Sequence, residues 1–137
     1  MIDRKKLAQI VFRSSEQLEI LEKCIHPQVI SEIKNIYTQI NAKGAYSLFV
    51  VEIPLLFEIQ FASWFDATIA ITAPEKITMQ RLQQQGHLTE QEYTQRMMRQ
   101  LPPEKKAQLA TFVIENTGDL KTLRENVSHI FYKLIKE

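Results

Sequence analysis

The chain has 137 residues, of which 45% are hydrophobic and 24% charged, and its formal net charge is +1. That length allows one domain with a real core, and the near-balanced charge argues against a nucleic-acid-coating protein or a polybasic membrane-surface protein. One cysteine, Cys24, excludes an internal disulfide and a cysteine-based metal site. We expect a cytoplasmic protein without a membrane-spanning run, with Cys24 as a small buried hydrophobe.

Helical spacing of apolar residues dominates the N-terminal third of the chain. Asp3 can cap an opening helix, and Ser14 can cap a short second one. Pro27 fits the first turn of a third helix, which Gly44 is predicted to end. The pattern therefore predicts three helices before the first strand.

Three short apolar runs are predicted as strands, over residues 48–51, 67–73 and 112–115. Pro54 closes the first run, because proline cannot donate a ladder hydrogen bond. Since helical patterns separate the runs, the sequence predicts an α/β protein with a parallel sheet of three strands.

Two polar helical segments lie on either side of Gly86, between the second and third predicted strands. They carry Arg81, Arg96 and Arg99. A mobile helical flap with arginines suits phosphoryl transfer, because it supplies cations to the phosphoryl oxygens and excludes water when it closes. Spacing alone equally allows a solvated helix face.

Other chemistries have less support in the sequence. His26, His87 and His129 lie far apart with no paired spacing, so no zinc site is predicted. The chain has no Gly-x-Ser-x-Gly elbow, and Cys24 lies in an apolar helix, so no serine or cysteine nucleophile is predicted.

Several stretches resemble, in order and rough spacing, the signature segments of dephospho-CoA kinases. Residues 51–58 carry the family's Pro-Leu-Leu-x-Glu core, and the resemblance spans nearly the whole chain. The other matching stretches are 3–12 ("DRxxLxxxVF"), 21–27 ("LxxxxHP"), 81–89 (the start of the lid), 96–100 ("RxxxQ") and 110–116 ("ADxVIxN").

The resemblance implies a P-loop kinase that transfers the γ-phosphoryl of ATP to the 3′-hydroxyl of dephospho-CoA, the last step of CoA synthesis, with Mg²⁺. It implies catalytic contacts from Arg81 and Arg96 to the ATP phosphates. It also implies that Arg99 and Asn116 bind ATP, with Asn116 near the adenine. A plain turn role for Asn116 stays open.

On the acceptor side, the resemblance implies that His26, Pro54, Leu55, Leu56 and Glu58 line the dephospho-CoA pocket. His26 has a simpler alternative role as a cap for the helix that follows it. The implied partners are small molecules, with no nucleic acid and no membrane, and exposed strand edges make self-association an expectation. The implied divisions are a helical acceptor-side subdomain over 1–46, an α/β core over 47–80 and 110–137, and a lid over 81–109.

The chain departs from the family pattern at the phosphate loop. None of its three glycines is followed by Lys-Ser or Lys-Thr, and the G-x-x-x-x-G-K-S/T loop and the general base are absent from the sequence. We expect a C-terminal portion of such a kinase, with an incomplete sheet, no activity alone, and Mg²⁺ ligands mostly outside these residues. The alternatives are a non-catalytic binding module derived from a P-loop kinase and another P-loop small-molecule kinase.

Two smaller departures affect the lid and the last strand. Gln85 stands where the family usually has a second lid arginine, and Thr111 replaces the aspartate of "ADxVIxN". Glu52 is acidic at a position where the family is not uniform. We predict for it a water-mediated contact with Mg²⁺ and no more.

Overall fold

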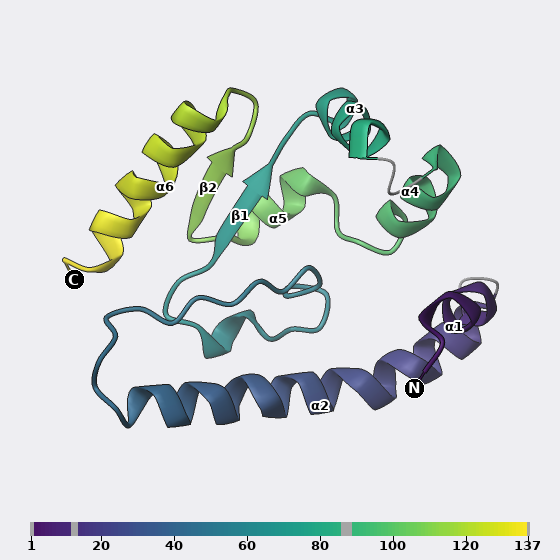
Figure 1. Cartoon of the computed structure of the whole chain (residues 1–137), viewed down its shortest axis with the longest axis horizontal. Helices are drawn as coiled ribbons and strands as arrows, with labels where there is room; N and C mark the ends of the chain where they lie inside the picture. Colours follow the sequence, from purple (N-terminus) through teal and green to yellow (C-terminus); the bar gives the residue numbers. More distant parts are fainter. Residues whose placement is uncertain (1, 12–13, 86–88, 137) are drawn as a thin grey trace. The chain divides into compact units, whose positions relative to one another are not determined.

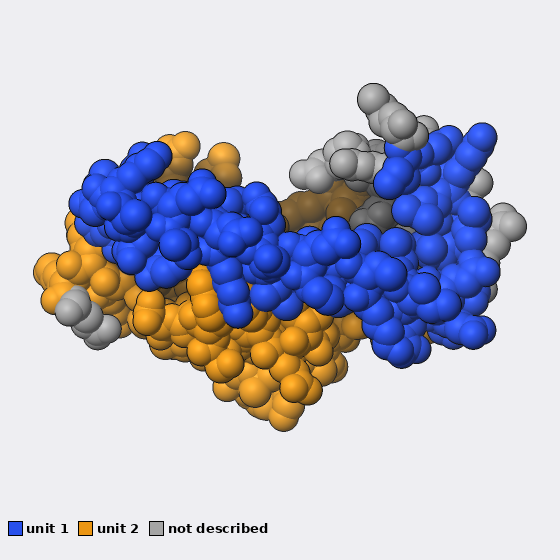
Figure 2. Space-filling model, turned by 90° about the horizontal axis from the view of Figure 1, so that it is seen from below, with its two compact units in different colours: residues 1–51 blue, residues 52–137 orange. Residues whose placement is uncertain are grey.

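The computed structural model of the chain describes residues 2–11, 14–85 and 89–136 (Figure 1). The chain divides into two compact units, Met1–Val51 and Glu52–Glu137, which are coloured separately in Figure 2. No helix in the described ranges is both long and apolar enough to cross a bilayer. The elements in chain order are α1 (Arg4–Val11), α2 (Ser15–Asn41), η1 (Ala62–Trp64), β1 (Ile69–Thr72), α3 (Glu75–Gln85), α4 (Glu90–Met97), α5 (Pro103–Leu109), β2 (Phe112–Glu115) and α6 (Leu120–Leu134).

Unit 1 is a helical pair in which α1 packs against α2. The predicted caps are present: a carboxylate oxygen of Asp3 accepts the N–H of the residue three positions on (3.1 Å), and Ser14 Oγ does the same for α2 (3.3 Å). Among the described residues of this unit, the buried apolar side chains are Val11, Leu18 and Ile33. The interior is therefore small, and local capping matters for where each helix begins.

The predicted break at Pro27 is wrong, because α2 continues through it from Ser15 to Asn41. Pro27 lacks the N–H that would donate to the carbonyl of Lys23, which costs one helical hydrogen bond and about 3 kcal/mol. The helix-forming residues on both sides outweigh that single loss. The predicted second and third helices are thus one helix, which ends just before Gly44, whose φ is +58°.

Cys24 lies on α2 and is exposed, so the prediction that it is buried is wrong. The small interior of unit 1 explains the difference. A 27-residue helix with one short partner has few positions that it can bury, and the apolar side chains take them.

Unit 2 contains a parallel sheet of two strands, β1 and β2, with Ile69 paired to Phe112 and Thr72 paired to Glu115. Helix α5 packs against β1 and α6 against β2 (Figure 1). Ile114 is the most deeply buried core residue, with 3% of its surface exposed. The α/β class, the parallel sheet and two of its predicted strands are confirmed.

The first predicted strand, over residues 48–51, is wrong: these residues form no strand, and Val50 is 79% exposed. An apolar run becomes a strand only when a neighbouring backbone accepts and donates the ladder hydrogen bonds. Among the described residues no segment pairs with 48–51, so the sheet has two strands rather than three.

A turn over residues 54–60 follows and leads into η1. Gln60 ends the turn in the left-handed region, at φ 55°. Phe61 is buried, stacks on Trp64 at 5.4 Å between ring centroids, and meets Phe65 edge-on at 5.3 Å. The aromatic segment thus contains a single helical turn, η1, whose flanking rings contact one another.

The two strands begin at a reciprocal threonine pair. Thr68 N–H donates to Thr111 Oγ1 (3.0 Å), and Thr111 N–H donates to Thr68 Oγ1 (3.1 Å). Thr68 is itself buried. The hydroxyl of Thr111, at the position where the family pattern has aspartate, thus satisfies a backbone donor at the start of the sheet.

A capping box precedes α4 (Glu90–Met97). Thr89 N–H donates to a carboxylate oxygen of Glu92 (2.9 Å), and Glu92 N–H donates to Thr89 Oγ1 (3.3 Å). Tyr93 on the same helix is buried, and burial together with the charge of Glu75 raises its pKa. Helix α4 is therefore anchored through an aromatic side chain.

Candidate functional site

The carboxyl ends of β1 and β2 lie together, because the strands are parallel and in register. Asn116, the residue after β2, donates its N–H to the carbonyl of Thr72 at the end of β1 (2.7 Å). Ligands of parallel α/β sheets bind beyond these strand ends. Asn116 therefore lies at the edge of the sheet where ligands of this sheet type bind.

Arg81 reaches the same place from α3. Its Nη1 donates to the carbonyl oxygen of Asn116 at 2.9 Å, and its side chain is half-buried. The structure thus brings together two residues nominated from the sequence as ATP contacts. The guanidinium has five N–H donors and uses one of them on the described residues, so the others can bind phosphate oxygens.

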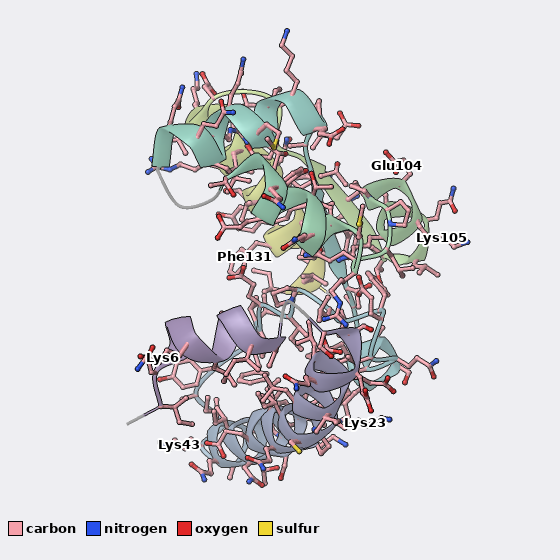
Figure 3. All side chains as sticks on the ribbon, turned by 90° about the vertical axis from the view of Figure 1, so that its right-hand side faces the viewer. Lys6, Lys23, Lys43, Glu104, Lys105 and Phe131 are labelled. Carbon is pink, nitrogen blue, oxygen red and sulfur yellow. The ribbon has the colours of Figure 1, made fainter. Side chains whose placement is uncertain are left out.

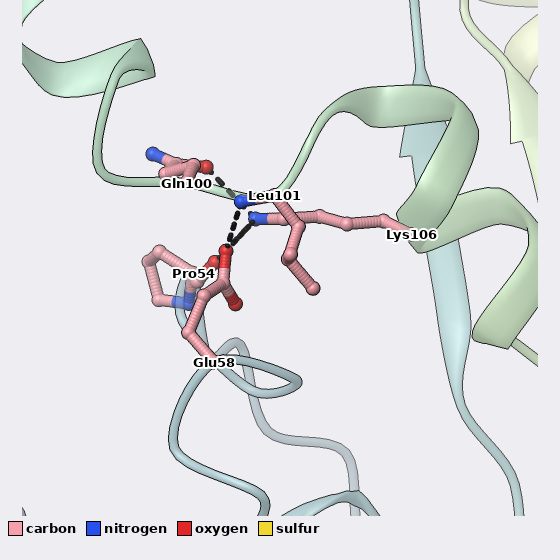
Figure 4. Close-up of polar contacts among 5 residues, drawn as sticks. All are labelled: Pro54, Glu58, Gln100, Leu101 and Lys106. Carbon is pink, nitrogen blue, oxygen red and sulfur yellow. Dashed lines mark hydrogen bonds and ion pairs between the residues drawn. The ribbon is translucent and has the colours of Figure 1, made fainter.

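A second polar cluster forms around Lys106, and we call its five residues, Pro54, Glu58, Gln100, Leu101 and Lys106, the Lys106 cluster (Figure 4). Glu58 Oε1 accepts the N–H of Leu101 (2.8 Å) and the Nζ of Lys106 (3.0 Å). The Glu58 and Lys106 side chains are only 16% and 18% exposed. The ion pair is largely buried and joins residues 48 positions apart, and the Leu101–Glu58 hydrogen bond spans 43 positions.

Lys106 has no ammonium donor left over. Its Nζ also donates to the carbonyl oxygen of Pro54 (2.9 Å) and to Oε1 of Gln100 (2.8 Å). With the bond to Glu58, these contacts occupy all three N–H groups of a lysine ammonium. Lys106 therefore holds the protein's own segments together rather than offering a free cation.

The pKa of the Glu58 carboxyl is set by opposing effects. Burial alone would raise it, but the Leu101 N–H and the Lys106 ammonium stabilise the charged form, and the net effect lowers the pKa below its ordinary 4.5. The second oxygen, Oε2, is buried and accepts no hydrogen bond from the described residues. The contacts of Oε1 with Leu101 and Lys106 thus stabilise the charge of Glu58, together with the backbone of Glu58 itself.

The remaining acceptor-side residues fall into two places. Leu55 and Leu56 are half-buried within the turn over 54–60, and Pro54 is exposed. His26 lies on α2 of the other unit and is half-exposed. The structure brings the four turn residues together with each other, while the pairing of His26 with them stays a prediction.

The structure says less about the other two arginines nominated from the sequence. Arg96 belongs to α4, and its side chain lies outside the described part of the chain. Arg99 follows that helix and is exposed. Their proposed contacts with ATP stay predictions.

Sequence reasoning missed Lys106. Lys105 and Lys106 are adjacent and look alike in the sequence, and only their positions on α5 separate an exposed lysine from a buried one. A weak signal was available, because a carboxylate such as Glu58 that follows an apolar turn needs a cation if it is buried. Gln100 was present in the "RxxxQ" stretch, but without an assigned role.

No group of three or more His, Cys, Asp or Glu side chains among residues 2–11, 14–85 and 89–136 is placed to hold a metal ion. The donor set in these ranges does not fit a protein-built Mg²⁺ site.

The comparisons with known proteins agree with the resemblance seen in the sequence. The family model described as dephospho-CoA kinase matches residues 1–122. The dephospho-CoA kinase of Chlamydia abortus is 39% identical over 132 residues, which cover 96% of this chain and 65% of that protein. The chain thus spans about two thirds of the length of the curated relatives that it matches.

Two solved structures resemble the fold. The crystal structure of TT1252 from Thermus thermophilus matches with a TM-score of 0.75 and 32% identity, over 96% of this chain and 67% of that one. A dephospho-CoA kinase from Campylobacter jejuni matches with a TM-score of 0.66 and 30% identity, over 98% of this chain and 66% of that one.

Proposed function

Because this chain belongs to the dephospho-CoA kinase family, we propose that it takes part in the ATP-dependent phosphorylation of the 3′-hydroxyl of dephospho-CoA to give CoA. The observation that carries the proposal is the family match over residues 1–122. The chain's substrates in this proposal are two small molecules, ATP and dephospho-CoA. We further propose that the chain is cytoplasmic and that it has no nucleic-acid partner.

On the nucleotide side, we propose that Arg81 binds ATP phosphate oxygens and that Asn116 lies near the adenine. The contact between Arg81 Nη1 and the Asn116 carbonyl supports this, because it holds a guanidinium beside the carboxyl ends of β1 and β2. Residues 81–109 act as the lid, and Arg96 and Arg99 supply further phosphate contacts as it closes. Mg²⁺ enters the site with the ATP phosphates.

On the acceptor side, we propose that the turn over residues 54–60 forms part of the dephospho-CoA site. Pro54, Leu55 and Leu56 provide its surface, and Glu58 keeps the turn in place through its bonds to Leu101 and Lys106. A contact between His26 and dephospho-CoA is a separate part of the proposal.

Titration calorimetry on the 137-residue chain tests the substrate assignment. We expect dephospho-CoA to bind and a nucleoside monophosphate such as CMP not to bind. Binding of CMP without dephospho-CoA would favour another P-loop small-molecule kinase, and binding of neither would overturn the assignment.

A coupled ADP-release assay tests the catalytic part. The 137 residues contain no G-x-x-x-x-G-K-S/T loop, whose amides and lysine hold the phosphates in P-loop kinases. We therefore expect no turnover above background from this chain alone. Turnover dependent on dephospho-CoA would contradict that expectation.

A further inference from the structure

The lid segment and the acceptor-side turn are joined by one side chain. Lys106 lies on α5, near the end of residues 81–109, and its ammonium contacts both Pro54 and Glu58 of the turn over 54–60. The Leu101 N–H, in the connection that leads from α4 to α5, donates to the same Glu58 oxygen. The turn and the lid end therefore share a carboxylate.

The turn also has its own internal hydrogen bonds. Leu56 N–H donates to the Ile53 carbonyl (3.3 Å), Ile59 N–H to that of Leu55 (3.0 Å), and Phe61 N–H to that of Leu56 (3.1 Å). These bonds shape the turn locally, but none of them fixes it against another segment. That attachment comes from Lys106 and from the Leu101 amide.

The geometry points to Lys106 as a positioning residue: it ties the acceptor-side turn to the end of the lid, so that the two segments are ordered together when dephospho-CoA binds. The coupling to dephospho-CoA rests on the proposed function. Lys106 does not itself touch substrate, because its three donors are occupied within the protein.

The burial of the cluster gives the coupling its strength. The paired side chains of Glu58 and Lys106 are largely shielded from water. A hydrogen-bonded ion pair is much stronger in such a low-dielectric environment than at the surface. Oε2 of Glu58 is also buried and accepts nothing from the described residues, so removal of the ammonium leaves the carboxylate with Leu101 as its main donor. Loss of Lys106 therefore loosens the turn and the lid end at once.

Hydrogen–deuterium exchange of the 137-residue chain tests the attachment without any ligand. In K106M we expect the amides of 55–61 and of Leu101 to exchange about tenfold faster, while Phe112, bonded to Thr68 in the sheet, keeps its rate. K105M is the matched control, since Lys105 is exposed and points outward from α5 (Figure 3). Unchanged exchange in K106M, or faster exchange in only one of the two segments, would overturn the proposal.

A second measurement tests the coupling to substrate. Dephospho-CoA is expected to slow exchange in both segments of the wild-type chain, and K106M should weaken its binding about tenfold and lose the protection at Leu101. K106R should recover part of both effects, because guanidinium donors can reach the same acceptors. Wild-type affinity and protection in K106M would overturn the coupling.

The two proposals fail in different ways. If the wild-type chain does not bind dephospho-CoA, the proposed function fails, and the ligand-free exchange still decides whether Lys106 attaches the turn. If K106M does not fold, E58Q replaces it, because the amide keeps an acceptor oxygen while the charge is lost. Faster amide exchange in both segments of E58Q would support the attachment, and unchanged exchange in E58Q would overturn it.

Discussion

The Lys106 cluster and the Arg81–Asn116 contact both use a basic side chain to join distant segments. They differ in the number of N–H donors that the side chain keeps available for other partners. The ammonium of Lys106 donates all three of its N–H groups, to Pro54, Glu58 and Gln100. The guanidinium of Arg81 donates one of its five N–H groups to the described residues. A saturated buried cation stabilises the fold, whereas a cation with spare donors beside strand ends is available to a ligand.

The acceptors sharpen this contrast. Lys106 faces a carboxylate, so its loss leaves a buried negative charge behind. Arg81 faces a neutral carbonyl, which water can satisfy after the arginine is removed. Substitution of Lys106 should therefore lower stability more than substitution of Arg81 does.

The largest loss of stability is expected for K106M. Removal of one partner of a buried ion pair should lower the free energy of unfolding by about 3 kcal/mol. Urea unfolding followed by circular dichroism measures this. K105M, which changes an exposed lysine on the same helix, should stay within about 0.5 kcal/mol of wild type, and equal losses in the two variants would show that the cluster contributes little.

T111V should cost less, about 2 kcal/mol, because it removes neutral hydrogen bonds rather than a charge partner. The variant leaves the Thr68 N–H without its acceptor at the start of the sheet. Urea unfolding again gives the value, and T111S, which keeps the hydroxyl, is the control. A wild-type free energy of unfolding in T111V would mean that water replaces the lost bonds.

R81M should lower the free energy of unfolding by only about 1 kcal/mol, since one hydrogen bond to a carbonyl is lost. Its ATP affinity, measured by calorimetry on the same chain, should fall about tenfold. R124M, which changes an exposed arginine on α6, is the matched control for charge. A large loss of stability with unchanged ATP binding would remove the contrast between the two sites.

The smallest effect is the pH dependence contributed by Glu58. Its folded-state pKa is lowered below 4.5, so the stability that it contributes is fully present above that pH and is lost as the pH falls through the folded pKa. Unfolding free energies of wild type and E58Q between about pH 6 and about pH 3 should therefore converge on acidification. A constant difference would show that the charge of Glu58 is not what stabilises the cluster.

Several elements follow from the sequence alone because their signals are local. Asp3 and Ser14 cap helices as predicted, and Asp119 caps α6 in the same way, since a side-chain oxygen and the free N–H groups of the first turn lie within three residues. The strands β1 and β2 are apolar runs between breakers. By contrast, the continuation of α2 through Pro27 depends on a balance between one lost bond and many retained ones, which spacing does not reveal.

The candidate site divides in the same way. The residue types and their order in the chain determined the family resemblance, and they nominated Arg81, Arg96 and Arg99 and the stretch over residues 54–58 as candidates for the site. Only the tertiary structure decided that Arg81 meets Asn116, that residues 48–51 form no strand, and that Lys106 rather than Lys105 pairs with Glu58. The physical reason is that caps and periodicity act within a few residues, whereas hydrogen-bond partners across 35 or more positions exist only once the chain has folded.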